Sequence, residues 1–125
     1  MHSKGKGDVA VARAVAYYTI KGLQVLLPLG DRQKYDLVVD DGVSFCKVQC
    51  KYSSVIKDSG GYEIALRVQG GNKSCYTSRL YRSGDFDRLF VVTAGEKMYD
   101  IPASFAFDRN SIVVGGKLYT EYEVK

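Results

Sequence analysis

The chain is poor in the residues that most often build zinc sites and nucleophilic centres. Its 125 residues include a single histidine, His2, and three cysteines. It has no Cys-x-x-Cys pair and no histidine-rich tract, so we expect neither a zinc site nor a Ser-His-Asp or Cys-His mechanism. Cys46 and Cys50 lie too far apart along an expected strand to bond each other. An odd number of cysteines without such a framework is typical of a reducing compartment.

Long apolar runs are also missing. No segment reaches the roughly 18 successive apolar residues of a membrane-spanning helix, and the first residues lack the apolar centre of a secretory signal. We therefore expect an intracellular protein without a membrane partner. The net charge of +4 is weakly basic, which permits an anionic partner without demonstrating one.

The length favours a single domain over residues 1–125. Residues 1–7 are small and basic and include two glycines, which predicts a flexible arm. Asp8 precedes an alanine-rich stretch and Gly22 follows it, and this pattern predicts a helix over 8–21.

A meander of strands is predicted for the rest of the chain. The expected strands cover 23–29, 35–39, 43–51, 62–68, 88–93, 97–101, 111–114 and 117–122, with a short helix at 102–107 and an irregular excursion at 69–87. Asp40-Asp41-Gly42 predicts a hairpin turn between the second and third strands. The predicted class is α/β, with a mixed or mainly antiparallel sheet and helices packed on its faces.

Three polar residues interrupt this otherwise apolar hairpin. Asp36 lies near the loop end of one strand, and Gln49 and Lys51 lie two apart near the far end of the other, so the three should meet at one end of the hairpin. One interpretation is a simple salt bridge between Asp36 and Lys51. The other is a phosphodiester-hydrolysing site, in which Asp36 and the Cys50 carbonyl ligate a divalent cation and Lys51 stabilises the developing negative charge.

The hairpin resembles the core of the PD-(D/E)XK nuclease superfamily, which has an acid at the start of strand two and (Glu/Asp/Gln)-x-Lys on strand three. The likeness covers about residues 4–68, including K-G-D-V-A-V-A-R-A-V-A at 6–16, K-G-L-Q-V-L-L-P-L-G-D at 21–31 and Y-D-L-V-V-D-D-G at 35–42. It is strongest toward Holliday-junction-resolving enzymes and intron-encoded homing endonucleases. The resemblance implies a restriction-endonuclease-like core, with a mixed central sheet, an active-site β-hairpin and flanking helices.

The resemblance also implies a DNA endonuclease that depends on Mg²⁺ or Mn²⁺. Asp36 would be a direct metal ligand, Gln49 and the Cys50 carbonyl further ligands, and Lys51 the residue that orients the attacking hydroxide. The family's helix-one glutamate aligns with Val11, so its role passes to Asp8, whose alternative role is a helix N-cap. Because Gln49 is uncharged, we expect the site to hold its cation more weakly, or to hold only one cation tightly.

Basic residues that fall mainly in expected loops are predicted to contact DNA phosphates: Lys4, Lys6, Arg32, Lys34, Lys73, Arg79 and Arg82. The expected partner is double-stranded or branched DNA in the cytoplasm, in the nucleoid or on phage or plasmid DNA. Cleavage of four-way (Holliday) junctions is preferred, because the short chain has no separate base-reading module. The alternatives are a sequence-specific homing endonuclease, a catalytically silent DNA-binding subunit and a plain interaction protein.

A small nuclease that must cut two strands is expected to act as a homodimer, with a tetramer as the alternative. We predict that its interface involves the apolar strands at 88–93 and 112–114.

Overall fold

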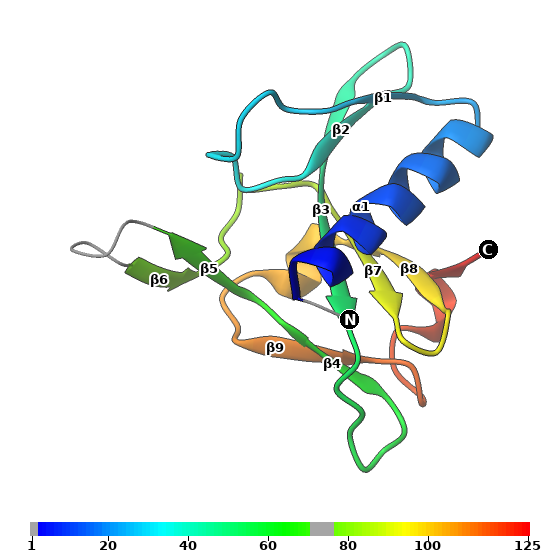
Figure 1. Cartoon of the computed structure of the whole chain (residues 1–125), viewed down its shortest axis with the longest axis vertical. Coiled ribbons are helices and arrows are strands. Elements are labelled where there is room, and N and C mark those ends of the chain that lie inside the picture. Colours follow the sequence, from blue (N-terminus) through cyan, green and yellow to red (C-terminus); the bar gives the residue numbers. More distant parts are fainter. Residues whose placement is uncertain (1–2, 71–76) are drawn as a thin grey trace.

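The computed structural model describes residues 3–70 and 77–125. In chain order its elements are α1 (Ser3–Ile20), β1 (Gln24–Leu26), β2 (Leu37–Asp40), β3 (Phe45–Ser53), β4 (Tyr62–Ala65), β5 (Arg67–Gly70), β6 (Thr77–Leu80), β7 (Arg88–Thr93), β8 (Met98–Pro102), the 3₁₀ turn η1 (Ala103–Ala106), β9 (Ser111–Val114), the 3₁₀ turn η2 (Thr120–Tyr122) and β10 (Glu123–Val124). Figure 1 shows their arrangement.

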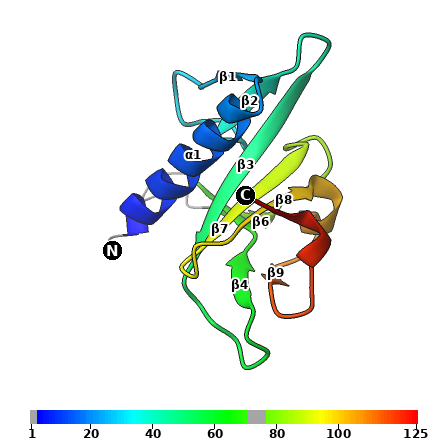
Figure 2. The ribbon, with the colours of Figure 1, turned by 90° about the vertical axis from the view of Figure 1, so that its right-hand side faces the viewer.

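A six-stranded sheet with the order β1-β2-β3-β7-β8-β10 forms the centre of the molecule. β3 and β7 run parallel, and the other neighbours pair antiparallel. This confirms the predicted α/β class with a mixed sheet. In Figure 2, α1 lies on one side of the sheet, while β4 and β9 lie below it. The opposite face is covered mainly by the β4–β9 pair and η1 rather than by a second α-helix.

The two faces of the sheet carry separate apolar clusters. Ala10, Ala14 and Tyr18 recur at four-residue steps, so they form one stripe of α1, and this stripe packs on a cluster that includes Val48 and Phe90. The other face carries a cluster built around Leu66, Tyr81, Phe86, Leu89, Val91 and Ile101. Since side chains alternate along a strand, successive residues of β3 belong to different faces.

The helix begins at Ser3, before the predicted start at Asp8, so the predicted arm is helical from that residue onward. Gly5 and Gly7 each lower helix propensity by about 1 kcal/mol, which favoured an irregular arm. Tertiary contacts outweigh that cost: Ala10 and Ala14 are fully buried on the sheet, and Lys6 Nζ donates to Ser54 Oγ at 3.0 Å. Within the described residues, no helix has the length and apolar content needed to cross a bilayer.

Other segments also differ from the sequence prediction. The strand expected at 62–68 is divided into β4 and β5, which belong to different sheets. β5 pairs with β6, which lies inside the expected excursion, in a two-stranded ribbon. The strand expected at 117–122 is instead a turn, η2, because Tyr119 adopts a left-handed φ of 61° that interrupts extended backbone.

The apolar strands proposed for a dimer interface both contribute to the core. β7 lies between β3 and β8, and its residues from Leu89 to Thr93 are buried within one chain. Ile112 and Val114 of β9 are also buried. For 88–93 that prediction is therefore wrong, because β7 has a neighbour on each edge and its apolar residues pack in the protein's own core. For 112–114 it stays a prediction, since β9 pairs with β4 along one edge only among the described residues.

Candidate active site

The β2–β3 hairpin sets the register of the three polar residues. Asp41 Oδ1 accepts hydrogen bonds from the backbone N–H groups of Val43 and Ser44, and Gly42 has a φ of 89°, which closes the tight turn. Leu37 then pairs with Val48. The turn role predicted for Asp40 and Asp41 is what the structure shows.

Asp36 lies one residue before β2 and is tied to β3 at two points. Its backbone N–H donates to the Val48 carbonyl at 2.8 Å, and its Oδ2 accepts the Cys50 N–H at 2.8 Å. Burial raises the pKa of the Asp36 carboxyl above its ordinary value, while the Cys50 N–H and the nearby Lys51 ammonium oppose that rise. One carboxylate oxygen is therefore fixed by the backbone, and Oδ1 is left for another ligand.

Gln49 and Lys51 lie on the sheet face opposite α1, since they alternate with Val48 and Cys50, which pack under the helix. Gln49 Nε2 donates to the Cys50 carbonyl oxygen at 3.3 Å. This contact orients the amide.

Lys51 Nζ lies 5.2 Å from the centroid of the Tyr81 ring, over its face. Within residues 3–70 and 77–125, the ion pairs within 4.0 Å do not include one between Lys51 and Asp36. The simple salt-bridge interpretation therefore fails, because an aromatic ring rather than the carboxylate holds the ammonium.

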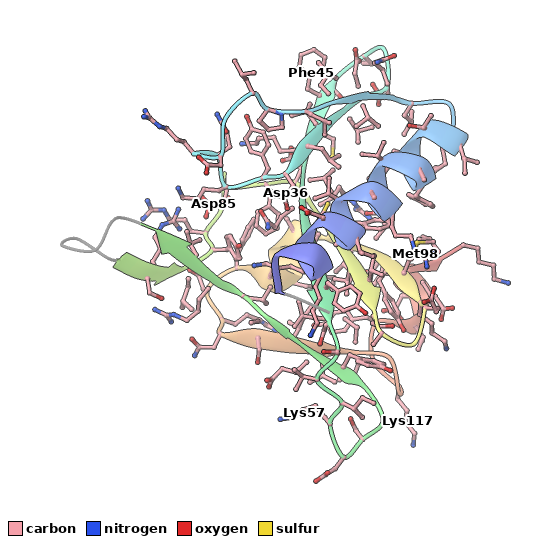
Figure 3. The ribbon with its side chains drawn as sticks, viewed as in Figure 1. Asp36, Phe45, Lys57, Asp85, Met98 and Lys117 are labelled. Atoms are coloured by element: carbon pink, nitrogen blue, oxygen red, sulfur yellow. The ribbon has the colours of Figure 1, made fainter. Side chains whose placement is uncertain are left out.

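Two adjoining hollows are lined by residues of this hairpin end. The first, of about 280 Å³, is lined by Leu27, Pro28, Gly30, Asp31, Gln33, Tyr35 and Asp36. The second, of about 490 Å³, is lined by Gln33, Lys34, Lys51, Ala65, Arg67, Val68, Tyr81 and Asn110. Gln33 lines both, so an acidic hollow adjoins a basic one. Figure 3 shows Asp36 near the middle of the molecule, away from the labelled Lys57 and Lys117.

Sequence reasoning did not identify Gln33, Arg67 and Asn110 as site residues. They come from three separate segments that meet only in the folded chain, and no spacing signal links them. In the sequence, Tyr81 is an aromatic residue between Arg79 and Arg82, and this pattern is as typical of a DNA-binding groove as of a subunit interface.

Asp8 lies in α1, exposed to solvent, and the start of the helix at Ser3 rules out the N-cap role. α1 packs on the face opposite Gln49 and Lys51, so no described contact joins Asp8 to them. Its metal role stays a prediction.

The predicted DNA-contacting residues lie in different settings. Lys34 lines the basic hollow, Lys6 donates to Ser54, and Arg32 and Arg82 are exposed. Arg79 makes a two-pronged ion pair with Asp85 at 3.0 and 3.1 Å. Lys73 and the side chain of Lys4 lie outside the described residues.

The donor atoms at the hairpin end suit a hard divalent cation. Asp36 Oδ1, the Gln49 amide oxygen and the Cys50 carbonyl are all oxygen donors, which Mg²⁺ and Mn²⁺ prefer. Within the described part of the chain there is no group of three or more His, Cys, Asp or Glu side chains that could hold a metal ion. Asp36 is the only carboxylate among the three donors named above, so together they offer a cation one full negative charge.

A model of the PD-(D/E)XK endonuclease family matches residues 1–115 of this chain. The chain belongs to the PD-(D/E)XK endonuclease family. The solved structure of the bacterial homing endonuclease I-Ssp6803I is similar to this chain, with a TM-score of 0.80 and 30% sequence identity over 96% of this chain and 82% of that one. No curated protein matches the sequence. The restriction-endonuclease-like core implied by the hairpin is thus confirmed.

Proposed function

We propose that this protein is a divalent-metal-dependent DNA endonuclease that hydrolyses phosphodiester bonds. The observation that carries the proposal is the end of the β2–β3 hairpin. There the Cys50 N–H holds the Asp36 carboxylate, and the Lys51 ammonium lies over the Tyr81 ring without an ion pair to that carboxylate among the described residues. This placement leaves both charges available to a bound phosphate and its metal ion.

Each residue has a role that follows from its chemistry. Asp36 Oδ1, the Gln49 amide oxygen and the Cys50 carbonyl would hold Mg²⁺ or Mn²⁺. When bound, such an ion supplies a water of lowered pKa and neutralises phosphate charge. The Lys51 ammonium, half-buried beside the hollow, orients the attacking hydroxide and stabilises the charge that develops on the phosphate oxygens. Asp8 is the candidate for an additional ligand from α1.

Sequence-specific cleavage of duplex DNA is the favoured activity, because the solved structure matched over 96% of this chain is a homing endonuclease. Junction-selective cleavage, the first choice from sequence, stays a prediction without a comparable observation in its favour. A catalytically silent DNA-binding subunit is the third candidate, because the Gln49 amide adds no charge to the metal site.

Homodimer formation, with a tetramer as the alternative, also stays a prediction, but the fold suggests a different surface for it. Leu26, Leu27 and Phe45 are exposed and line a shallow apolar hollow beside edge strand β1. Exposed apolar patches of this kind mark interaction sites. Phe45→Glu should lower the oligomeric state in sedimentation velocity, and an unchanged state would exclude this surface.

One cleavage assay tests the proposed activity. The substrates are a four-way junction, its matched linear duplex and a pool of long duplexes of randomised sequence, each with Mg²⁺ or Mn²⁺. Cleavage of discrete members of the pool is expected. Cutting confined to the junction would establish junction selectivity instead, and binding without cleavage in either metal would establish the silent subunit.

Four variants assign the site. Asp36→Ala and Lys51→Ala should abolish cleavage. The matched controls Asp58→Ala and Lys117→Ala remove one charge each from exposed positions away from the hairpin end and should cleave like the wild type. Cleavage that survives both Asp36→Ala and Lys51→Ala would refute the site assignment.

A further inference from the structure

The basic hollow beside the cleavage site contains more positive charge than the proposed chemistry uses. Lys34, Lys51 and Arg67 line it, and its described lining includes no carboxylate. Of these three, only Lys51 has a role in the proposed hydrolysis. A concave surface of about 490 Å³ with uncompensated cations is suited to an anion.

Arg67 is the best-oriented cation in this hollow. Its Nε donates to Ser78 Oγ at 2.8 Å, its Nη1 to Asn110 Oδ1 at 2.8 Å and its Nη2 to the Ser78 carbonyl at 3.2 Å. Asn110 is itself held, because its carbonyl accepts the Leu66 N–H at 2.8 Å. The guanidinium is therefore clamped between β6 and the loop before β9.

All three partners of Arg67 are neutral acceptors. Arg13, Arg79 and Arg88 each contact a carboxylate, whereas Arg67 has no such partner among the described residues. A guanidinium has five N–H donors, so these three bonds leave two unused. Such an arginine is positioned in advance but not neutralised, which favours two-pronged binding of a phosphate.

The position of the hollow indicates which phosphate it would bind. It shares Lys51 with the cleavage site, and it shares Gln33 with the hollow that contains Asp36. A DNA strand whose scissile phosphate lies between Asp36 and Lys51 would continue into this basic hollow. β5 and β6, which supply Arg67 and Ser78, form the ribbon that projects from the body in Figure 1.

We propose that this hollow is a second phosphate subsite, in which Arg67 binds a backbone phosphate next to the scissile one on the same DNA strand. Lys34 adds a second positive charge, and Asn110 and Ser78 act as positioning residues for Arg67. This inference rests on the proposed nuclease function, and its substrate is the phosphodiester backbone, independent of base sequence.

The test is the salt dependence of DNA binding, measured with duplex DNA in Ca²⁺ or without metal so that no strand is cut. Arg67→Gln should bind on the order of ten-fold more weakly at 0.1 M salt. It should also reduce the slope of log K against log salt by about 0.9, the value for one lost phosphate contact. Lys117→Gln removes one charge from an exposed position outside the hollow and should leave both quantities unchanged.

A second variant separates charge from geometry. Arg67→Lys keeps the charge but lacks the planar fork, so it should weaken binding while retaining the wild-type slope. It also tests the subsite if Arg67→Gln fails to fold. Wild-type affinity and slope in a folded Arg67→Gln would overturn the subsite alone, whereas a wild-type protein that binds no DNA would refute the proposed function itself.

A methylphosphonate scan locates the phosphate. Each substrate carries one neutral phosphate near the mapped cut, and binding is measured for the wild type and Arg67→Gln. At one position beside the cut, neutralisation should weaken the wild type several-fold and leave Arg67→Gln unaffected. If no position shows this coupling, the hollow does not hold a neighbouring phosphate.

Discussion

Replacing Tyr81 with leucine should show whether the Tyr81 ring holds Lys51 in position. Tyr81 is 4% exposed, its ring packs edge-on against Phe86 at 5.0 Å, and its face lies 5.2 Å from Lys51 Nζ. Tyr81→Leu removes the aromatic pair and the cation–π contact, each about 1 kcal/mol. The smaller side chain leaves a void that adds about 1 kcal/mol. The expected loss of unfolding free energy is therefore about 3 kcal/mol, out of the 5–15 kcal/mol that is roughly typical of a domain.

A double-mutant cycle with Lys51→Met isolates the cation–π part. Urea denaturation in metal-free buffer should give a coupling energy of about 1 kcal/mol between the two positions. Tyr81→Phe is the matched control, because it keeps both ring interactions and should change stability little. In the cleavage assay, Tyr81→Leu should slow the reaction by about ten- to a hundred-fold, since Lys51 is left intact but poorly placed.

The coupling energy decides whether Tyr81 positions Lys51. Independent sites add within about 0.3–0.5 kcal/mol, so a coupling no larger than that would refute the argument. A Tyr81→Phe variant as slow as Tyr81→Leu would refute it too, because the ring would then not be the element that matters.

Three further predictions concern charge and packing. Asp36→Asn should abolish cleavage yet stabilise the metal-free fold at neutral pH, because burial raises the pKa of this carboxyl. In the wild type, the favourable contribution of Asp36 to the free energy of unfolding is fully present below its ordinary pKa of 3.8 and is lost as pH rises through the raised pKa. Asp36→Asn should therefore stabilise the fold more at pH 7 than in acid, and an equal gain at both pH values would contradict this account. Gln49→Glu should tighten Mn²⁺ binding about ten-fold in calorimetry by adding a ligand charge, and unchanged affinity would remove Gln49 from the metal shell. Gly61→Ala should lower unfolding free energy by about 1–3 kcal/mol, because its Cβ would lie 2.6 Å from Val113 Cγ1. Gly30→Ala, with open space around it, is the matched control for chemical denaturation, and equal stability of the two variants would contradict the predicted clash.

The sequence alone predicted the hairpin and its polar end because both depend on local rules. A two-residue period places Gln49 and Lys51 on one face, and the Asp40-Asp41-Gly42 turn sets the register that brings Asp36 to β3. The parallel pairing of β3 with β7 was not deducible, because it joins segments far apart in the chain. The burial of β7 was not deducible from the sequence either, and this burial excludes the dimer interface predicted for residues 88–93.

The surroundings of Lys51 were decided by tertiary structure only. Tyr81 lies in the chain between β6 and β7, Arg67 begins β5, and Asn110 precedes β9, so no spacing along the sequence connects them to the hairpin. The start of α1 was likewise set by packing, since the glycines at 5 and 7 oppose a helix locally. Residue types and short-range periodicity thus determined which atoms can do chemistry. Long-range packing determined that Lys51 faces an aromatic ring and an open basic hollow instead of Asp36, because only the folded sheet brings those segments together.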